Sequence, residues 1–130
     1  MTLNELKKIV NLHDNEKLAN LSGLDLSGLN LSGLDLSGLD LSNADLSYAC
    51  LNKANLRGAS LHKAILAGAE LYEADLRGAD LSYSDWTDTD VCSSKFCDAN
   101  INGAYQWMDG PSHRLVQNEY DPRANTANVW

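Results

Sequence analysis

Hydrophobic residues recur along this chain at a fixed interval of five. Leucine occupies every fifth position from Leu21 to Leu81, and Trp86, Val91, Phe96 and Ile101 continue the series. These positions define seventeen consecutive units with no break in register. They exclude a leucine-rich repeat, because its units recur only every 20 to 29 residues or so and require asparagine where this chain has Leu29.

A second apolar series lies two residues before the first and changes its identity along the chain. It starts at Ala19, is leucine in the next four units, and is then alanine at every fifth position from Ala44 to Ala79. The later members are Ser84, Thr89, Ser94, Ala99 and Ala104. Residues two apart in an extended segment point to the same side. Both series are therefore expected to face inward, and the residue between them, mostly Asp or Asn, outward.

The other two residues of each unit have the composition of a tight turn. Serine follows the central leucine in seven units, and eight of the nine glycines occupy the position after that. Glycine at a fixed place in a turn supplies the positive φ that the third residue of a type II turn requires. One short extended piece and one turn in every five residues predict a solenoid.

The unit Ala-(Asp/Asn)-Leu-X-X closely resembles the repeat of the pentapeptide repeat family, and the resemblance covers residues 19–104. Periodicity alone does not fix the number of sides in a coil. The resemblance implies a right-handed quadrilateral parallel β-helix with four units per coil. We therefore expect an all-β solenoid of about four coils, which is roughly 20 Å tall at about 4.8 Å per coil.

An amphipathic helix is expected to cover the N-terminal end of this solenoid. Thr2 and Glu5 are spaced as a capping box, with Met1 able to pack on Leu6. The apolar face of a helix from residue 3 to about 12 consists of Leu3, Leu6, Ile9 and Val10. Leucine replaces alanine in the first coil only, at Leu24, Leu29, Leu34 and Leu39. We expect these four leucines to form an apolar seat for the helix.

The C-terminal end departs from the repeat. Gln106 occupies the next inward position after Ile101, and Asp109-Gly110-Pro111 predicts a turn. A short helix is expected from residue 111 to 119, followed by a poorly ordered tail. The predicted organisation is a capping helix and linker at residues 1–18, a β-helix at 19–104, and a C-terminal cap and tail at 105–130.

The composition is acidic, with 18 Asp and Glu against 10 Lys and Arg and a net charge of -8 over 130 residues. Direct binding to nucleic acid or to an anionic membrane is not expected, since both are bound through Lys and Arg. No apolar run reaches the roughly 18 residues of a membrane span. The N-terminal segment lacks the apolar stretch of a secretory signal, so a cytoplasmic location is expected.

Residues with catalytic or metal-binding chemistry are few. The histidines, His13, His62 and His113, are far apart in sequence. Asp85, Asp88 and Asp90 lie close together but lack the glycine and the distal glutamate of a calcium loop. A solvated acidic face is favoured there over a cation site. We expect no catalytic residue, no cofactor and no metal ion, and the chain is not expected to be an enzyme.

The cysteines favour free thiols over a disulfide. Cys92 and Cys97 occupy equivalent outward places on consecutive sides of the coil, so their side chains should diverge. Pairing them would also leave Cys50 without a partner.

Surface charge gives a functional indication. Residues 19–103 contain twelve acidic and five basic side chains. Some quinolone-resistance members of the family are acidic dimeric rods that imitate duplex DNA and bind DNA gyrase, so the resemblance implies such a mimic as one alternative. The net charge here is about one per 3 Å of axis, against one per roughly 1.7 Å in duplex DNA. The mimicry is therefore weak unless the chain dimerises end to end.

We favour a non-enzymatic protein-interaction or scaffold module of unassigned cellular role. The alternative is an acidic DNA mimic that binds gyrase or another topoisomerase. The candidate interaction residues are Asp80, Asp85, Asp88 and Asp90. The partner is expected to be a protein. A monomer is favoured over an end-to-end homodimer through a C-terminal apolar cluster of Trp86, Tyr105, Trp107 and Met108.

Overall fold

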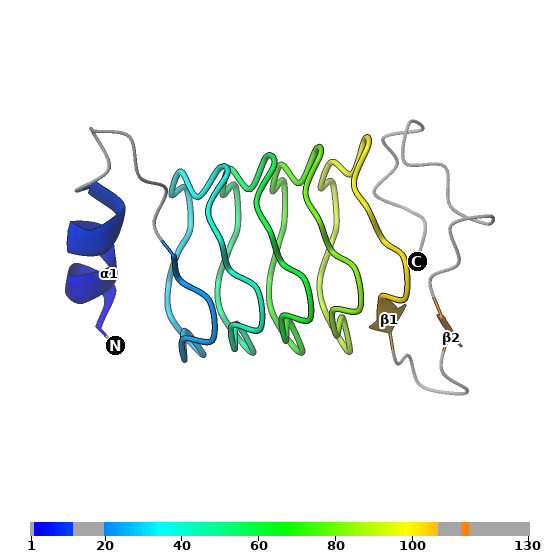
Figure 1. Cartoon of the computed structure of the whole chain (residues 1–130), viewed down its shortest axis with the longest axis horizontal. Helices are drawn as coiled ribbons and strands as arrows, with labels where there is room; N and C mark the ends of the chain where they lie inside the picture. The colour runs from blue at the N-terminus through cyan, green and yellow to red at the C-terminus, as the bar shows by residue number, and fades with distance from the viewer. Residues whose placement is uncertain (1, 12–19, 107–112, 115–130) are drawn as a thin grey trace.

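The computed structural model of the chain describes residues 2–11, 20–106 and 113–114. Figure 1 shows a stack of coils with helix α1, Leu3–Asn11, at its N-terminal end. The short strands β1, Tyr105–Gln106, and β2, His113–Arg114, lie at the other end. Within the described residues no helix is both long and apolar enough to cross a membrane.

Helix α1 begins with the capping box that the sequence predicts. The backbone N–H of Thr2 donates to Oε2 of Glu5 at 2.7 Å, and the N–H of Glu5 donates to Oγ1 of Thr2 at 3.2 Å. Leu6 is fully buried in the same apolar cluster as the leucines of the coils, and Leu3 packs partly buried against that cluster. Met1 and the side chains of Ile9 and Val10 lie outside the described part.

Parallel bridges join residues twenty positions apart in the stack of coils. They run from Asn20–Asp40 to Asp80–Asn100, and they fall into four rows because bridged residues recur every five positions. Four five-residue units therefore make one turn of the stack. Each bridge involves a single pair of residues, which explains why the coils contain no longer strands.

The backbone hydrogen bonds follow the five places of the unit. Place one is the inward leucine, places two and three form the turn, place four is the second inward residue, and place five is the outward residue. Places one and three donate to the following coil, whereas place five donates to the preceding coil. Examples are Leu41 to the Ser60 carbonyl at 2.8 Å, Asn43 to His62 at 2.8 Å, and Asp45 to Leu24 at 2.9 Å.

Each turn is closed within its own unit. The N–H of place four donates to the carbonyl of place one, as from Ala44 to Leu41 at 3.1 Å. Place three has the positive φ that the glycine pattern predicts, for example 71° at Gly23. Nine units hold another residue there, including Tyr48 at 57° and Tyr83 at 58°. Such a residue occupies a left-handed conformation that glycine adopts at lower cost.

The core is a column of buried leucines continued by Trp86, Val91, Phe96 and Ile101. Trp86 explains why serine replaces alanine two residues earlier. Its indole N–H donates to Oγ of Ser84 at 2.6 Å, and its ring contacts Phe96 edge-on at a centroid distance of 5.8 Å. A buried indole N–H is costly without an acceptor, so the large residue and the serine are coupled.

The four leucines of the first coil line the end of the stack at which α1 lies. Leu39 is buried, and Leu24, Leu29 and Leu34 are partly buried against the core cluster that includes Leu6. This arrangement is compatible with the predicted seat, whose capping role stays a prediction.

The C-terminal segment differs from the sequence expectation. Of the short helix expected at 111–119, only His113–Arg114 are described, and these two residues form strand β2. They pair antiparallel with β1, Tyr105 with Arg114 and Gln106 with His113. The helix prediction is wrong for these two residues, because strand β1 just beyond the last repeat provides a hydrogen-bonding partner that local sequence does not reveal.

Candidate functional site

The Asp and Asn residues at place five have a structural role that was not predicted from the sequence. Each accepts a hydrogen bond at Oδ1 from the backbone N–H two residues later, as from Ser42 to Asp40 at 2.9 Å. The complete set is Asn20, Asp25, Asn30, Asp35, Asp40, Asp45, Asn55, Asp75, Asp80, Asp85, Asp90 and Asn100. The spacing Asp-X-Ser is the signal that could have indicated these Asx turns.

These hydrogen bonds also affect titration. Donation from the hydroxyl of the following serine, and then from its N–H, holds the pKa of Asp25, Asp35 and Asp40 below the ordinary range of an aspartate. A charged acceptor binds these donors more strongly than a neutral one. The three carboxylates therefore stabilise the fold while they charge the surface.

The structure does not bring the four predicted interaction residues together on one side. Asp80, Asp85 and Asp90 belong to three different rows of bridges. Asp80 also accepts a hydrogen bond from Nδ2 of Asn100 at 3.1 Å, which ties it to its own row. Asp88 lies in the turn between Asp85 and Asp90, with a φ of 52°. Their role in binding stays a prediction.

One row contains an exposed apolar residue between carboxylates. Its bridged members are Asp25, Asp45, Ile65 and Asp85. Ile65 is 41% exposed and occupies a place where most units have an Asx turn, so the N–H of Ala67 has no side-chain acceptor from place five. At place five this unit therefore exposes the apolar side chain of Ile65, whereas most other units have an Asp or Asn there that accepts a hydrogen bond from its own turn.

Two exposed tyrosines border this row on opposite sides. Tyr48 follows Asp45 by three residues and is 76% exposed, while Tyr83 precedes Asp85 by two residues and is 52% exposed. The ring of Tyr48 lies over Gly68 in the next coil, where an added Cβ would come within 2.6 Å of ring atoms. The ring of Tyr83 lies over Gly103 in the same way.

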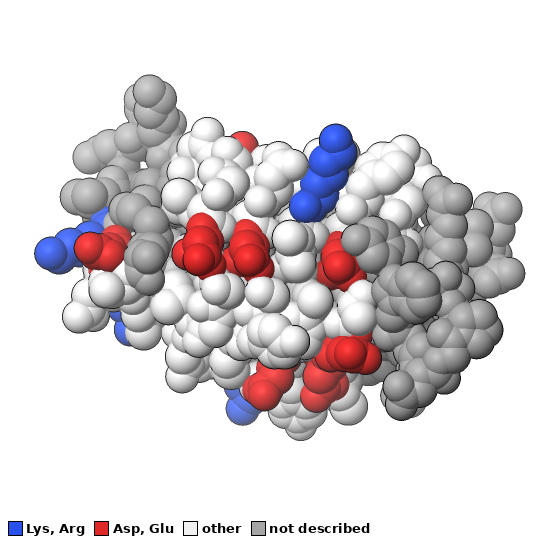
Figure 2. All heavy atoms as spheres, turned by 90° about the horizontal axis from the view of Figure 1, so that it is seen from below, with Lys and Arg blue, Asp and Glu red and all other residues white. Residues whose placement is uncertain are grey.

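We call Tyr48, Ile65 and Tyr83, with the carboxylates of Asp25, Asp45 and Asp85, the mixed face. Figure 2 shows acidic side chains following the long axis of the solenoid on one side, with few basic side chains among them. Lys63 lies in the turn two residues before Ile65 and is the nearest basic residue in sequence to this row. Next to it, Nδ1 of His62 lies 2.7 Å from Oγ of Ser82, and the His62 ring contacts Tyr83 edge-on at 5.8 Å.

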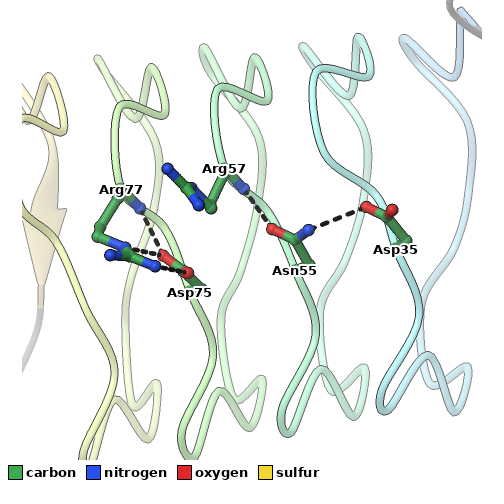
Figure 3. Close-up of polar contacts among 5 residues, drawn as sticks. All are labelled: Asp35, Asn55, Arg57, Asp75 and Arg77. Atoms are coloured by element: carbon green, nitrogen blue, oxygen red, sulfur yellow. Dashed lines mark hydrogen bonds and ion pairs between the residues drawn. The ribbon is translucent and has the colours of Figure 1, made fainter.

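On another side of the solenoid, Asp75 and Arg77 form an ion pair (Figure 3). Arg77 donates from Nε to Oδ1 of Asp75 at 2.8 Å and from its terminal nitrogen to Oδ2 at 2.6 Å. This bidentate hydrogen bonding lowers the pKa of Asp75 and raises that of Arg77. Beside it, Nδ2 of Asn55 donates to Oδ1 of Asp35 at 3.1 Å. Asp35, Asp75 and Arg77 are thus engaged with neighbours on this side, whereas the guanidinium of Arg57 makes no hydrogen bond or ion pair with a described residue.

Metal binding finds no support in the described residues. No three His, Cys, Asp or Glu side chains among them gather closely enough to hold a metal ion.

Comparison with known proteins gives the same repeat. The family model for pentapeptide repeats matches residues 19–58, 40–78 and 74–105, with eight copies of the repeat. The chain belongs to the pentapeptide repeat family. Membership of this family, together with the match to a solved pentapeptide repeat protein, implies a right-handed β-helix solenoid, in agreement with the stacked coils seen here.

Solved pentapeptide repeat proteins are similar to this one over most of its length. Rfr23 from the cyanobacterium Cyanothece 51142 is 30% identical with a TM-score of 0.71, and the match covers 74% of this chain and 65% of that one. This chain thus spans just under two thirds of Rfr23. The protein alr5209 from Nostoc PCC 7120 is 34% identical over 79% of this chain and 74% of that one, with a TM-score of 0.42.

A more distant match is QnrB1, a plasmid-mediated fluoroquinolone resistance protein. It is 22% identical over 62% of this chain and 54% of that one, with a TM-score of 0.35, and this likeness carries no functional argument. No curated protein matches the chain.

Proposed function

We propose that this pentapeptide repeat protein is a non-enzymatic interaction module that presents the mixed face to a protein partner. In this proposal the solenoid is a rigid post of about four coils, closed at its N-terminal end by α1. The observation that carries the proposal is the exposure of Ile65 within the row of carboxylates, with Tyr48 and Tyr83 exposed in turns at the two borders of that row.

The mixed face departs from the repeat at a cost in stability. Ile65 replaces an Asx-turn residue, which forgoes a hydrogen bond of about 1 kcal/mol. Tyr48 holds a left-handed backbone at φ 57°, which costs about 1 kcal/mol relative to glycine, although eight other units hold a non-glycine residue in the same conformation. Ile65 and Tyr48 both leave apolar surface in water. Exposed apolar patches with a polar rim are typical of interaction sites, and local rules of a fold are most often broken where function requires it.

The backbone of the solenoid suits a binding surface. Hydrogen bonds to both neighbouring coils fix the turns that carry the tyrosines, as from Tyr48 N–H to the Ala67 carbonyl at 2.9 Å. A partner therefore does not have to order this surface on binding, which lowers the cost of association.

The described residues offer little for catalysis. The closest approach to a nucleophile–base pair is the contact between His62 and Ser82, but the Ser82 side chain is buried. Within the described part no carboxylate hydrogen-bonds to the His62 ring to orient it, as a catalytic triad requires. This favours binding over reaction.

The test is affinity capture from the native cell with three forms of the protein. Besides the wild type, one form carries Tyr48→Gly with Ile65→Asn, and the matched control carries Lys53→Gly with Ser60→Asn. Each pair puts glycine at a place-three position with positive φ and Asn at place five, so both should fold. We expect a protein that is captured by the wild type and the control but lost with the first variant. Capture of the same proteins by all three forms would contradict the proposal.

The acidic row also supports the alternative, a DNA mimic that binds gyrase, but less well. Ile65 interrupts the carboxylates, and Arg57 and Arg77 stand one above the other on another side. The alternative predicts inhibition of gyrase supercoiling by micromolar protein, and unchanged supercoiling would eliminate it.

A further inference from the structure

We infer that the mixed face takes an extended basic segment of a partner protein, with arginine or lysine on either side of an apolar residue. This inference rests on the proposed function and specifies the chemistry of the partner. It starts from the exposed apolar patch of Tyr48, Ile65 and Tyr83 and takes the identity of the occupant from the charges around it.

The carboxylates beside the patch are held in fixed orientations. Oδ1 of Asp45 accepts from the N–H of Ser47 at 2.9 Å and from its hydroxyl at 2.5 Å. Oδ1 of Asp85 accepts from the N–H of Thr87 at 2.9 Å and from its hydroxyl at 2.6 Å. Within the described residues, no hydrogen bond or ion pair uses the Oδ2 atoms of these two side chains. Each carboxylate thus has one oxygen bound by its own turn and one open to a donor.

The row sets the spacing of the partner's cations. Asp45 and Asp85 are two coils apart, on either side of Ile65, which is about 9.6 Å at the usual spacing of neighbouring strands. In an extended chain residues two or four apart point to the same side, and four residues span about 13 Å. Basic residues at positions i and i+4, whose long side chains converge by about 2 Å at each end, therefore match the two carboxylates, and an apolar residue at i+2 meets Ile65. The tyrosine rings at the borders provide further contact area for an arginine side chain.

Charge complementarity selects this occupant over others. A second copy of the chain would place acidic rows against each other, which is unfavourable. Nucleic acids and anionic membranes carry the same sign as the row and are disfavoured for the same reason. Lys63 is the basic residue closest in sequence to the patch, and it opposes a cationic partner at one border.

The experiment titrates the whole protein with a synthetic peptide that carries Arg-Ala-Leu-Ala-Arg between Gly-Ser flanks. Binding is measured by calorimetry and by changes in the protein's amide chemical shifts. A peptide with glutamine in place of both arginines is the probe control. We expect shifts at Tyr48, Ile65 and Tyr83, and binding that weakens as salt rises. No binding of the arginine peptide up to millimolar concentration, or equal binding of the glutamine peptide, would overturn the inference.

Matched substitutions separate the mixed face from net charge. Asp45→Asn and Asp85→Asn keep the Asx-turn acceptor, as Asn30 and Asn55 do, and remove one charge from the row. Each should weaken peptide binding about tenfold. Asp40→Asn and Asp80→Asn remove the same charge from the neighbouring row and should change it less than about twofold. Equal effects in the two rows would show non-specific attraction and refute the inference.

The apolar centre and the opposing cation give two more outcomes. Ile65→Asn should weaken binding while it restores an Asx turn, and Lys63→Asn should strengthen it. Self-association of the wild type that Ile65→Asn abolishes in sedimentation would show a second copy as the occupant and overturn the inference.

The two proposals fail in different ways. If capture of a cellular protein requires Tyr48 and Ile65 but neither Asp45 nor Asp85, the proposed function stands and the inference of a basic partner is wrong. If no captured protein depends on Tyr48 and Ile65, the proposed function itself is wrong.

Discussion

The Asx turns predict that an aspartate at place five stabilises the fold through its acceptor atom more than through its charge. Asp40 is a suitable site, because its carboxylate bonds only to Ser42 among the described residues, with N–H at 2.9 Å and hydroxyl at 2.5 Å. Asp40→Ala leaves that N–H to water and should cost about 1 kcal/mol, as the loss of a helix N-cap does. In a chain of this length that is about 4 °C in Tm. Asp40→Asn keeps the acceptor and should lose less than half as much.

The assay is urea unfolding followed by circular dichroism, with Ser60→Ala as the control. Ser60 also occupies place five, and its side chain makes no hydrogen bond within the described residues. Ser60→Ala should therefore be close to neutral. If Asp40→Asn destabilises the protein as much as Asp40→Ala, or if Ser60→Ala does so, the Asx-turn reasoning is refuted.

The same bond sets a pH dependence. The folded-state pKa of Asp40 is lowered by Ser42, so the stabilisation is present above the unfolded-state pKa of about 3.9. It is lost as pH falls below that value through the folded-state pKa. Unfolding midpoints measured between pH 6 and pH 2.5 should fall more steeply below pH 4 or so for the wild type than for Asp40→Asn.

Three further predictions concern packing. Ser84→Ala removes the acceptor of the buried Trp86 indole N–H and should lower the free energy of unfolding, measured with urea, by about 2 kcal/mol. Ser94→Ala removes a hydroxyl that donates to a carbonyl of its own unit, and it should cost less than about half of that. Equal losses would contradict the coupling of Ser84 to Trp86. Gly68 and Gly28 have nearly the same φ, +68° and +66°. Gly68→Ala should nevertheless destabilise the protein by about 1 kcal/mol more than Gly28→Ala. The reason is that a Cβ at residue 68 meets the Tyr48 ring, whereas a Cβ at residue 28 meets no atom within 4 Å. In Tyr48→Gly protein this difference should vanish, and its persistence would show another cause. Leu6→Ala should lower the free energy of unfolding by about 3 kcal/mol, because Leu6 is fully buried. Lys7→Ala should change it very little, because Lys7 is exposed. A near-neutral effect of Leu6→Ala would argue against α1 as a cap.

Much of the fold could be predicted from sequence because the repeat unit is short and its conformation is local. Glycine at place three indicates a positive φ, and the two apolar places indicate which side chains face the core, as Leu41 and Ala44 do. Thr2 and Glu5 likewise indicate the start of α1 through contacts within one helical turn. Residues 113 and 114 were mispredicted as helix, because β2 depends on pairing with β1, which is not encoded nearby.

The candidate site could be predicted only in part. The acidity was evident, but the four aspartates selected from sequence lie around three sides of the coil. Tyr48 and Ile65 gave no sequence signal as a pair, since they are seventeen positions apart and belong to different coils. The Asx turns had a signal in the Asp-X-Ser spacing, but surface charge and turn composition alone were predicted from it.

The sequence by itself determined the conformation of each five-residue unit, because every turn closes with a hydrogen bond between residues of that unit, such as Ala44 to Leu41. Only the tertiary structure decided which units lie above one another. The number of units per coil depends on closure of the whole turn, and a period of five is compatible with more than one such number. Stacking at twenty residues placed Ile65 between Asp45 and Asp85 and laid the Tyr48 ring over Gly68. The mixed face exists because of that stacking.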